Sequence, residues 1–511
     1  MKKRKTIKGE SAFNRRDFLK IGTAGAALGT IGIASATKKA AANIVANETN
    51  KVIVNTQDDF PNEVRSDYKS IPSYSTVHGH GFFGRALMAM GIDVDKEAME
   101  QGDRFIHHVN YEYTKDKKGF DQLAKAVVGG AWALCSKGAG PMPGAVGDFG
   151  LLSWDNNKDK YPLALMDNDF VQKEKYDFES KQQAADAIKR AARLYGADLV
   201  GITKRDPRWD YTTQFNPIPP LARKITPMGP QQFKQLQDLG GENMKMAMDA
   251  HTPDKWLYKI EERAGFKPKS VIVMAFEMDY EAISCASNEI SSATVAEGYS
   301  RMTKSALQLA VMIRQLGYNA IPCGNDTGMS IPYAIAAGLG EGSRSSQLVT
   351  FKYGPRVRIA KVYTDFDILE YDKPKTFGVE EFCKRCKRCA DACPSKALPF
   401  EDEPTFEPTH EHKDNAYFNA PGVKKWYLDA KKCFKQWADS GTDCTNCIAA
   451  CPYNKPDFWH HRLVDGITAA MPGSVHSFMR EMDIVFGYGN VDDEKAVDRF
   501  FDPKDKGYDG F

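Results

Sequence analysis

The sequence predicts a mixed α/β protein, with helices layered on a sheet, followed by a smaller cysteine-rich domain. Between about residues 181 and 376, runs of helical periodicity alternate with short apolar runs typical of buried strands. Eight of the 11 cysteines then fall within residues 383–451, in two spaced groups. The 511 residues leave room for roughly two to four structural units.

The cysteine groups have the spacing of bacterial ferredoxins that hold two cubane iron–sulfur clusters. The first reads C-x2-C-x2-C-x3-C-P, and the second is a separate cysteine followed by C-x2-C-x3-C-P. In such ferredoxins the last cysteine of each group ligates the other cluster. We therefore predict two [4Fe-4S] clusters with these ligands: Cys383, Cys386, Cys389 and Cys451 for one, and Cys393, Cys433, Cys444 and Cys447 for the other. Disulfides or zinc are the alternatives, and the two C-P endings favour clusters.

The first 36 residues predict an export signal. A basic head leads into Asn14-Arg15-Arg16-Asp17-Phe18-Leu19-Lys20, which resembles the twin-arginine motif with Asn where Ser or Thr is usual. The weakly apolar run that follows is too short to span a membrane. It ends in Ala34-Ser35-Ala36, which fits a cleavage site, although alanines as late as Ala46 also fit. The alternative is a basic, disordered tail. We expect export of the folded protein by the twin-arginine translocase.

Charge and the remaining cysteines set two further expectations. The whole chain has a formal net charge of +2, and its basic excess lies in the first 36 residues, so the body is mildly acidic. A mildly acidic body gives no electrostatic reason to bind nucleic acid, so we expect no such partner. Cys135, Cys285 and Cys323 are expected to be small buried hydrophobes.

The chain after the signal divides into four further units. Residues 47–180 are expected to form an irregular unit that wraps the rest, with Gly129-Gly130-Ala131-Trp132 and the Gly/Pro-rich stretch 138–150 as loops. The α/β core covers 181–376, the two-cluster domain 377–458, and a C-terminal extension 459–511.

Two helix-then-strand units and one interruption make up the predicted core. In the first unit a helix over 184–192 precedes a strand at 197–202. A polar, proline-rich insertion at about 205–269 then precedes a buried strand at 270–276. In the second unit a helix over 306–313 leads to an extended segment from Ala320. A short helix at 333–339 and a strand at 357–363 complete the core.

The order of these parts resembles that of the reductive dehalogenases. Besides the signal and the cysteine groups, the segments at 318–328 (YNAIPCGNDTG), 337–341 (AGLGE), 353–358 (YGPRVR) and 372–383 are similar to that family. The resemblance covers the signal and about 180–465, and it is greatest to the tetrachloroethene branch.

The resemblance implies a nitroreductase-like core that holds a corrinoid in the base-off form. Asp249-Ala250-His251 begins a cobalt-binding D-x-H-x-x-G signature, but Asp254 replaces its Gly, so no protein histidine need bind the cobalt. The clusters would pass electrons to make Co(I), which attacks an organohalide, a chlorinated ethene above all, and hydrogen replaces the halogen. Further implied are a small integral-membrane anchor subunit, a quinol-linked electron donor chain, a place on the outer face of the cytoplasmic membrane, and a homodimer.

The resemblance also assigns active-site residues. Tyr299 matches the proton donor, Asn325 and Arg358 its polar partners, and Trp437 and Trp132 the aromatic cage around an apolar substrate. A guanidinium beside a phenol favours loss of its proton, and Arg358 would also assist the leaving halide. Cys433 stands eleven positions ahead of Cys444, which would leave room for Trp437 to turn toward the substrate. The alternatives are a core tyrosine, a solvated strand face for Arg358 and a tryptophan packed on a cluster.

Two other functions fit part of the sequence. Epoxyqueuosine reductases also combine a corrinoid with two cubane clusters, but they act on tRNA in the cytoplasm, which the export signal and the acidic body disfavour. A non-enzymatic periplasmic electron-transfer subunit would carry both clusters and no corrinoid. Cobalt content separates these alternatives.

Overall fold

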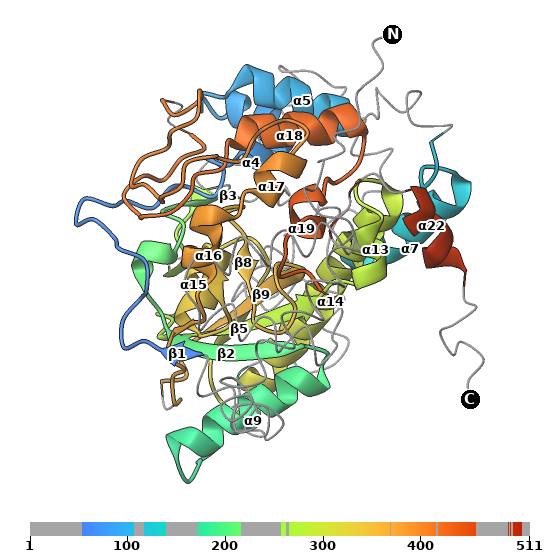
Figure 1. The fold of residues 1–511 in the computed structure, drawn as a ribbon. Helices are drawn as coiled ribbons and strands as arrows, with labels where there is room; N and C mark the ends of the chain where they lie inside the picture. The colour runs from blue at the N-terminus through green and yellow to red at the C-terminus, as the bar shows by residue number, and fades with distance from the viewer. Residues whose placement is uncertain are drawn as a thin grey trace, which may run out of the picture.

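A four-stranded sheet lies at the centre of the computed structural model (Figure 1). Its strands, in spatial order, are β2 (Leu199–Lys204), β5 (Ser270–Glu277), β9 (Val357–Thr364) and β6 (Ala320–Cys323). All three pairings are antiparallel. The structure describes residues 54–106, 117–138, 171, 173–215, 257–261, 265–367, 369–414, 417–455, 489, 491 and 494–502.

Helices cover both faces of this sheet because its central strands are apolar on both sides. On β5, Ile272, Met274 and Phe276 pack in one core with α9 (Lys181–Leu194) and α14 (Glu289–Gln315). The alternate residues of β5 face a second core that includes α15 (Ser330–Ala336). Since successive side chains of a strand point to opposite faces, an uninterrupted apolar run requires cover on both sides.

The predicted mixed α/β class is confirmed, and strands form where they were expected. The helix predicted over 306–313 is part of α14, which begins much earlier, at Glu289. Its start is set by a capping box: Asn288 accepts from the backbone N–H of Ser291, and Ser291 accepts from the backbone N–H of Asn288. Polar and small residues fill the first half of α14, which hides its helical periodicity.

The expectation that residues 47–180 are irregular is wrong for much of the segment. It contains α4 (Val77–Ala89), α5 (Lys96–Ile106) and α7 (Gln122–Gly138), so Gly129 and Trp132 lie in a helix and not in a loop. Glycine in a helix costs about 1 kcal/mol. Packing of α7 along α14 outweighs that cost, and the Ser300 hydroxyl of α14 donates to the Ala131 carbonyl at 2.6 Å. Residues 139–150 lie outside the described part.

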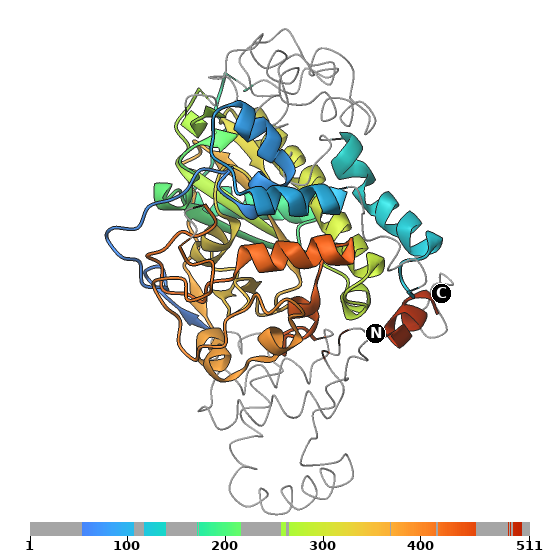
Figure 2. The ribbon, with the colours of Figure 1, turned by 90° about the horizontal axis from the view of Figure 1, so that it is seen from above.

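The two-cluster domain consists of four short helices above the sheet in Figure 1. They are α16 (Val379–Arg385), α17 (Arg388–Ala392), α18 (Ala430–Ser440) and α19 (Asn446–Ala449). Figure 2 shows α18 running alongside α5, with which it packs. The N-terminal segment crosses from core to cluster domain: β1 (Asn55–Thr56) pairs with β10 (Lys375–Thr376), and Val64 bridges to Val423.

Shorter elements complete the described structure. They are η1 (Pro207–Trp209), β3 (Gln214–Phe215), β4 (Leu257–Tyr258), α13 (Tyr280–Ser284), β7 (Glu341–Gly342), β8 (Leu348–Val349) and α22 (Glu494–Phe501). The pairing of β3 with β4 brings the two ends of the predicted insertion together. The body of the insertion, the predicted signal and most of 459–511 lie outside the described residues.

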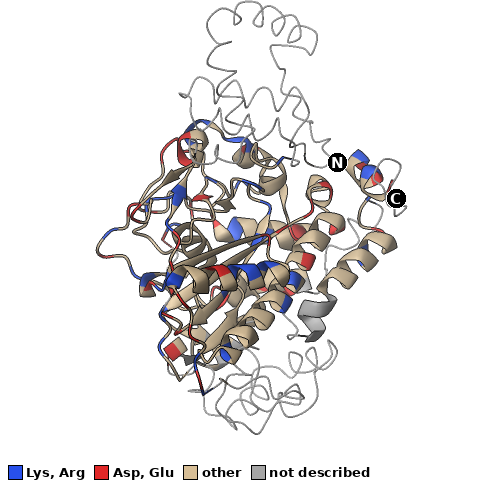
Figure 3. Ribbon diagram, turned by 90° about the horizontal axis from the view of Figure 1, so that it is seen from below, with Lys and Arg blue, Asp and Glu red and all other residues tan. Residues whose placement is uncertain are grey.

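Basic and acidic residues are interspersed over the described elements (Figure 3). Within those elements, none of the helices combines the length and the apolarity that crossing a membrane requires.

Candidate active site and iron–sulfur ligands

The eight thiols of the two cysteine groups come together in the cluster domain. Burial first, and then the charges of Cys383, Cys451, Cys386 and Cys447, raise the pKa of Cys389 well above its usual value. Burial first, and then the charges of Cys447, Cys444 and Cys393, likewise raise the pKa of Cys433. All eight are free thiols. Eight converging thiols suit cubane clusters, whose iron displaces the thiol protons.

A fully buried arginine of the core holds the first cysteine group in place. Arg344 stands between β7 and β8, and its guanidinium donates to the Cys383 carbonyl at 2.7 and 3.1 Å and to the Cys386 carbonyl at 3.1 Å. It also donates to the carbonyls of Pro399 and Glu401, at 2.9 and 2.6 Å. The loop that carries Arg344 therefore orients the backbone of the first cysteine group.

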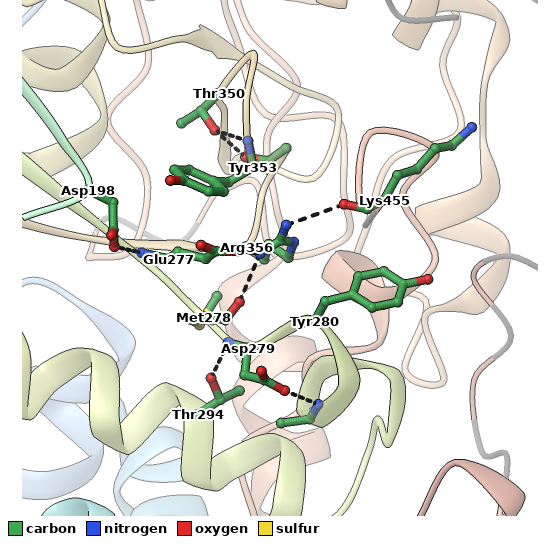
Figure 4. Close-up of polar contacts among 12 residues, drawn as sticks. Asp198, Glu277, Met278, Asp279, Tyr280, Thr294, Thr350, Tyr353, Arg356 and Lys455 are labelled. Carbon is green, nitrogen blue, oxygen red and sulfur yellow. Dashed lines mark hydrogen bonds and ion pairs between the residues drawn. The ribbon is translucent and has the colours of Figure 1, made fainter. Parts of the chain in front are cut away.

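A second buried arginine joins the end of the cluster domain to the sheet (Figure 4). Arg356 ion-pairs with Glu277 and donates to the Met278 carbonyl at 3.1 Å and to the Lys455 carbonyl at 3.3 Å. Glu277 and Met278 lie where β5 turns toward α13. Arg356 directly precedes β9, the strand that carries Arg358, so this contact ties the end of the cluster domain to the start of that strand.

The candidate active site centres on Tyr299 in α14. Its hydroxyl oxygen accepts a hydrogen bond from the Asn325 side-chain amide at 2.8 Å. The Arg358 guanidinium carbon lies 5.3 Å from the centroid of the Tyr299 ring. The Trp132 ring stacks on the same ring, with centroids 5.5 Å apart and planes 19° apart. Four of the five residues expected from the resemblance therefore meet around one phenol.

Gly298 makes this meeting possible. A Cβ atom at that position would lie 2.7 Å from Cγ of Arg358 and 3.2 Å from its Cβ, closer than packed carbon atoms approach. Only a glycine at this point of α14 lets the stem of Arg358 pass from β9 across the helix to Tyr299.

Asn325 is held by hydrogen bonds that Lys361 and Asp326 make to its loop. The Lys361 ammonium of β9 donates to the Gly324 carbonyl and to the Ser330 hydroxyl, the latter at 2.7 Å. Asp326 accepts from the Gly324 backbone N–H at 2.8 Å. Burial lowers the pKa of Lys361, while Asp326 opposes that change. The loop is thus fixed on both sides of Asn325, which leaves its amide pointing at Tyr299.

Trp437, the fifth expected residue, contacts a histidine that the sequence did not single out, and the charge of Arg358 acts on that histidine. The rings of His78 and Trp437 have centroids 4.9 Å apart. Burial first, and then the charge of Arg358, lower the pKa of His78 to about 4, so it is neutral at pH 7. His78 lies in the segment that resembles the family only loosely, so no sequence signal pointed to it.

His78 and Lys425 share an uncommon environment, because each side chain is accessible by surface area while protein surrounds it closely. Burial lowers the pKa of Lys425 to about 8. The buried N–H groups of Arg358 (Nε) and Trp437 (Nε1) have no hydrogen-bond partner among the described residues, so both are available to a bound group.

Comparison with known proteins agrees with this architecture. Residues 382–455 match the 4Fe-4S dicluster domain family. The tetrachloroethene reductive dehalogenase of Desulfitobacterium hafniense is 34% identical over 95% of this chain and 96% of that protein. The enzyme of the same name from Dehalobacter restrictus is 35% identical over the same shares.

A solved structure gives the same fold. It is a reductive dehalogenase structure described as suggesting a mechanism for B12-dependent dehalogenation, and it aligns with a TM-score of 0.57 and 20% identity over 89% of this chain. The alignment spans 51% of that chain, so this protein matches about half of its length. Identity over nearly the full length, the dicluster domain and the shared fold lead to one conclusion. The chain belongs to the reductive dehalogenases, oxidoreductases that act on carbon–halogen bonds.

Proposed function

We propose that this protein replaces a halogen of a chlorinated ethene by hydrogen, in the service of respiration. The carbon–halogen bond breaks, two electrons and one proton are taken up, and halide leaves. The arrangement of Tyr299 is the observation that carries the proposal. Its oxygen accepts from Asn325, so its own O–H is free to donate. We infer that it donates into a space bordered by Tyr299, Arg358 and His78, called the hollow below.

The cysteine quartets fit the electron supply. Cys433 and Trp437 stand four residues apart on α18, so they lie on the same face, one turn apart. Trp437 then contacts His78. One helix therefore connects a cluster ligand with the hollow beside Tyr299, which suits one-electron transfer from a cluster to a group bound there.

The residues around the hollow fit a corrinoid. A corrinoid carries many amide side chains, whose carbonyls would accept from the unpartnered N–H groups of Arg358 and Trp437. Asn325, exposed to the same side as the Tyr299 hydroxyl, adds an amide. When bound and reduced, the corrinoid supplies the electrons that cleave the carbon–halogen bond. The segment Asp249-Ala250-His251 lies outside the described residues.

The protein's own residues then handle the proton and the halide. Tyr299 donates the proton to the carbon that loses the halogen, and Arg358 compensates the negative charge that develops on the phenol and the halide. Trp132 covers the other side of the phenol and excludes water. An apolar, aromatic wall selects substrates by shape rather than by hydrogen bonding, which suits chlorinated ethenes. The names of the relatives agree with this substrate class.

We further propose export by the twin-arginine translocase and attachment to the outer face of the cytoplasmic membrane through a small integral-membrane anchor subunit. Electrons would come from a quinol-linked chain, and the homodimer also remains a proposal. The motif at Arg15 and Arg16 supports export. Replacing both arginines by lysine should leave the precursor unprocessed in the cytoplasm, while processing of the double variant at the wild-type rate would contradict this route.

The test of the main proposal is reconstitution. The full-length chain is assembled anaerobically with iron, sulfide and a cobamide, and assayed with reduced methyl viologen against tetrachloroethene, trichloroethene, a chlorinated ethane and a chlorinated phenol. We expect about eight iron atoms per chain, stoichiometric cobalt and release of chloride, fastest from an ethene. A protein that holds both clusters but binds no cobalt would overturn the corrinoid assignment. Release of chloride only from the phenol would overturn the substrate class.

A further inference from the structure

A cluster of two histidines and an aspartate lies away from Tyr299, at the start of α18. His410, His412 and Asp429 place one ligand atom each within 4.8 Å of one another. His412 Nδ1 is 2.8 Å from Asp429 Oδ2, and His410 Nδ1 is 3.8 Å from the same oxygen. None of the three has a role in the reaction proposed above.

A backbone N–H group orients the carboxylate of Asp429, as is common for carboxylates that bind metals. Asp429 is 1% exposed and caps α18 through Oδ1, which accepts from the Lys432 backbone N–H at 3.2 Å. That contact fixes the carboxylate, whose Oδ1 and Oδ2 lie 2.9 and 2.8 Å from His412 Nδ1, while Oδ2 also faces His410. A ligating carboxylate is commonly oriented in this way by a backbone donor.

His410 has no well-formed hydrogen bond within the described residues. Its side chain is 12% exposed, and neither ring nitrogen meets the distance and angle of a hydrogen bond there, although the Asn419 side chain lies beside the ring. A buried imidazole that is poorly paired costs about 1–3 kcal/mol. The hydrogen bond between His412 and Asp429 does not relieve this cost. A cation that binds His410 together with the other two residues would relieve it.

The donor set selects the kind of cation. Two imidazole nitrogens and one carboxylate oxygen suit Zn²⁺ or a neighbouring first-row transition metal, whereas Ca²⁺ and Mg²⁺ prefer oxygen ligands alone. Zinc binds His and Asp at about 2.0–2.2 Å in a tetrahedron. Small movements of these side chains bring their ligand atoms from the observed spacing to the positions of a tetrahedral site. His412 is 28% exposed, so a water molecule can complete the fourth position.

We propose that His410, His412 and Asp429 form a structural zinc site. The zinc joins the long segment that follows α17 to the first turn of α18, the helix that carries Cys433 and Trp437. It therefore sets the position of a cluster ligand and of a residue that reaches the hollow. This inference concerns folding of the cluster domain and does not depend on the identity of the organohalide.

The test measures zinc in the full-length protein that carries its clusters. The protein is incubated with ZnSO₄, desalted and analysed for zinc and iron, and zinc-edge X-ray absorption gives the ligands. Zinc that has entered the cysteine sites would show sulfur at about 2.3 Å, whereas this site gives only nitrogen and oxygen near 2.0 Å. We expect about one zinc per chain with the second pattern and no loss of iron.

Matched variants assign the zinc to these residues. His410→Ala combined with His412→Ala should lose the zinc and melt at a lower temperature with zinc present. Glu411→Gln is the control: Glu411 stands between the histidines but pairs with Lys432 at 2.9 Å, so this variant should keep the zinc. The proposal fails if the unaltered protein takes up no zinc, if the zinc has sulfur ligands, or if the double histidine variant binds as much as wild type. The first two outcomes are read on the unaltered protein, so misfolding of the variant cannot obscure them.

Discussion

The Asn325 amide donates to the Tyr299 hydroxyl oxygen at 2.8 Å. This single contact decides the direction of the phenolic proton. Since the oxygen is already engaged as an acceptor, the O–H must point elsewhere, and Trp132 and Arg358 occupy space next to the ring. The active-site predictions below depend on that orientation.

Loss of the phenol should abolish proton donation without disturbing cofactors. Tyr299→Phe is expected to retain iron and cobalt while kcat falls by about 10²–10⁴-fold. The control is Tyr371→Phe, which removes a hydroxyl that lies 2.9 Å from the Ser270 hydroxyl in the core. That variant should lose about 1 kcal/mol of stability and keep its turnover. Equal turnover in Tyr299→Phe and wild type would refute the donor role.

Reversing the hydrogen bond between Asn325 and Tyr299 should lower turnover more than removing it. In Asn325→Asp the carboxylate can only accept, so it draws the Tyr299 proton away from the substrate, whereas Asn325→Ala leaves the O–H free. We expect kcat to fall about tenfold in the alanine variant and about 100-fold or more in the aspartate variant. Steady-state kinetics at fixed cobalt content measures both. The opposite ranking would mean that Asn325 does not orient the phenol.

A methyl group at Gly298 should displace Arg358. Gly298→Ala is expected to lose about 1–3 kcal/mol of stability and most activity, because its Cβ would lie 2.7 Å from Cγ of Arg358. Gly129→Ala in α7 is the matched control. No atom lies within 4 Å of a Cβ there, so this variant should gain about 0.5–1 kcal/mol. Chemical denaturation of both proteins gives the comparison, and similar destabilisation of both would contradict the packing argument.

Arg344 should govern the first cysteine quartet. Arg344→Gln leaves the carbonyls of Cys383, Cys386 and Glu401 without their buried donor, so we expect a loss of about 3–5 kcal/mol and lower iron content. Loss of a nearby positive charge should also lower the midpoint potential of that cluster, measured by EPR redox titration. Arg65→Gln is the control. It removes surface ion pairs with Asp67 and Glu407 and should leave stability and iron content close to those of wild type.

The stability that Glu289 contributes should fall as the pH rises from about 4.5 to about 7. Burial above all, with Asp443 adding to it and Lys125 opposing it, raises the pKa of Glu289 to about 7, from an ordinary value of 4.5. The folded protein therefore keeps a proton that the unfolded chain releases, and this contribution is full below about pH 4.5 and lost by about pH 7. Glu289→Gln should remove that slope and stabilise the protein at pH 8, by at most about 2 kcal/mol after solvent screening. Denaturation at pH 5 and pH 8 tests it, and an unchanged slope in the variant would contradict it.

Local sequence patterns account for most of the correct predictions. The cysteine spacing predicted eight converging thiols because cluster ligands must lie a few residues apart on short helices. Apolar runs predicted β5 and β9 because both strands are buried on both faces. The same reasoning failed for α7, since Gly129 and Gly130 disfavour a helix locally and only packing against α14 supports one.

The sequence by itself determined the spacing of the eight cysteines, the mixed α/β class and, through resemblance, the residues that meet at Tyr299. The tertiary structure decided how they meet. Asn325 follows β6 and Arg358 lies on β9, its neighbour in the sheet, while Tyr299 comes from a helix that crosses this sheet. The place of His78 beside Trp437 and of His410 beside Asp429 was likewise invisible in the sequence. Such contacts join residues far apart in the chain, and only strand order and helix packing fix their side-chain directions.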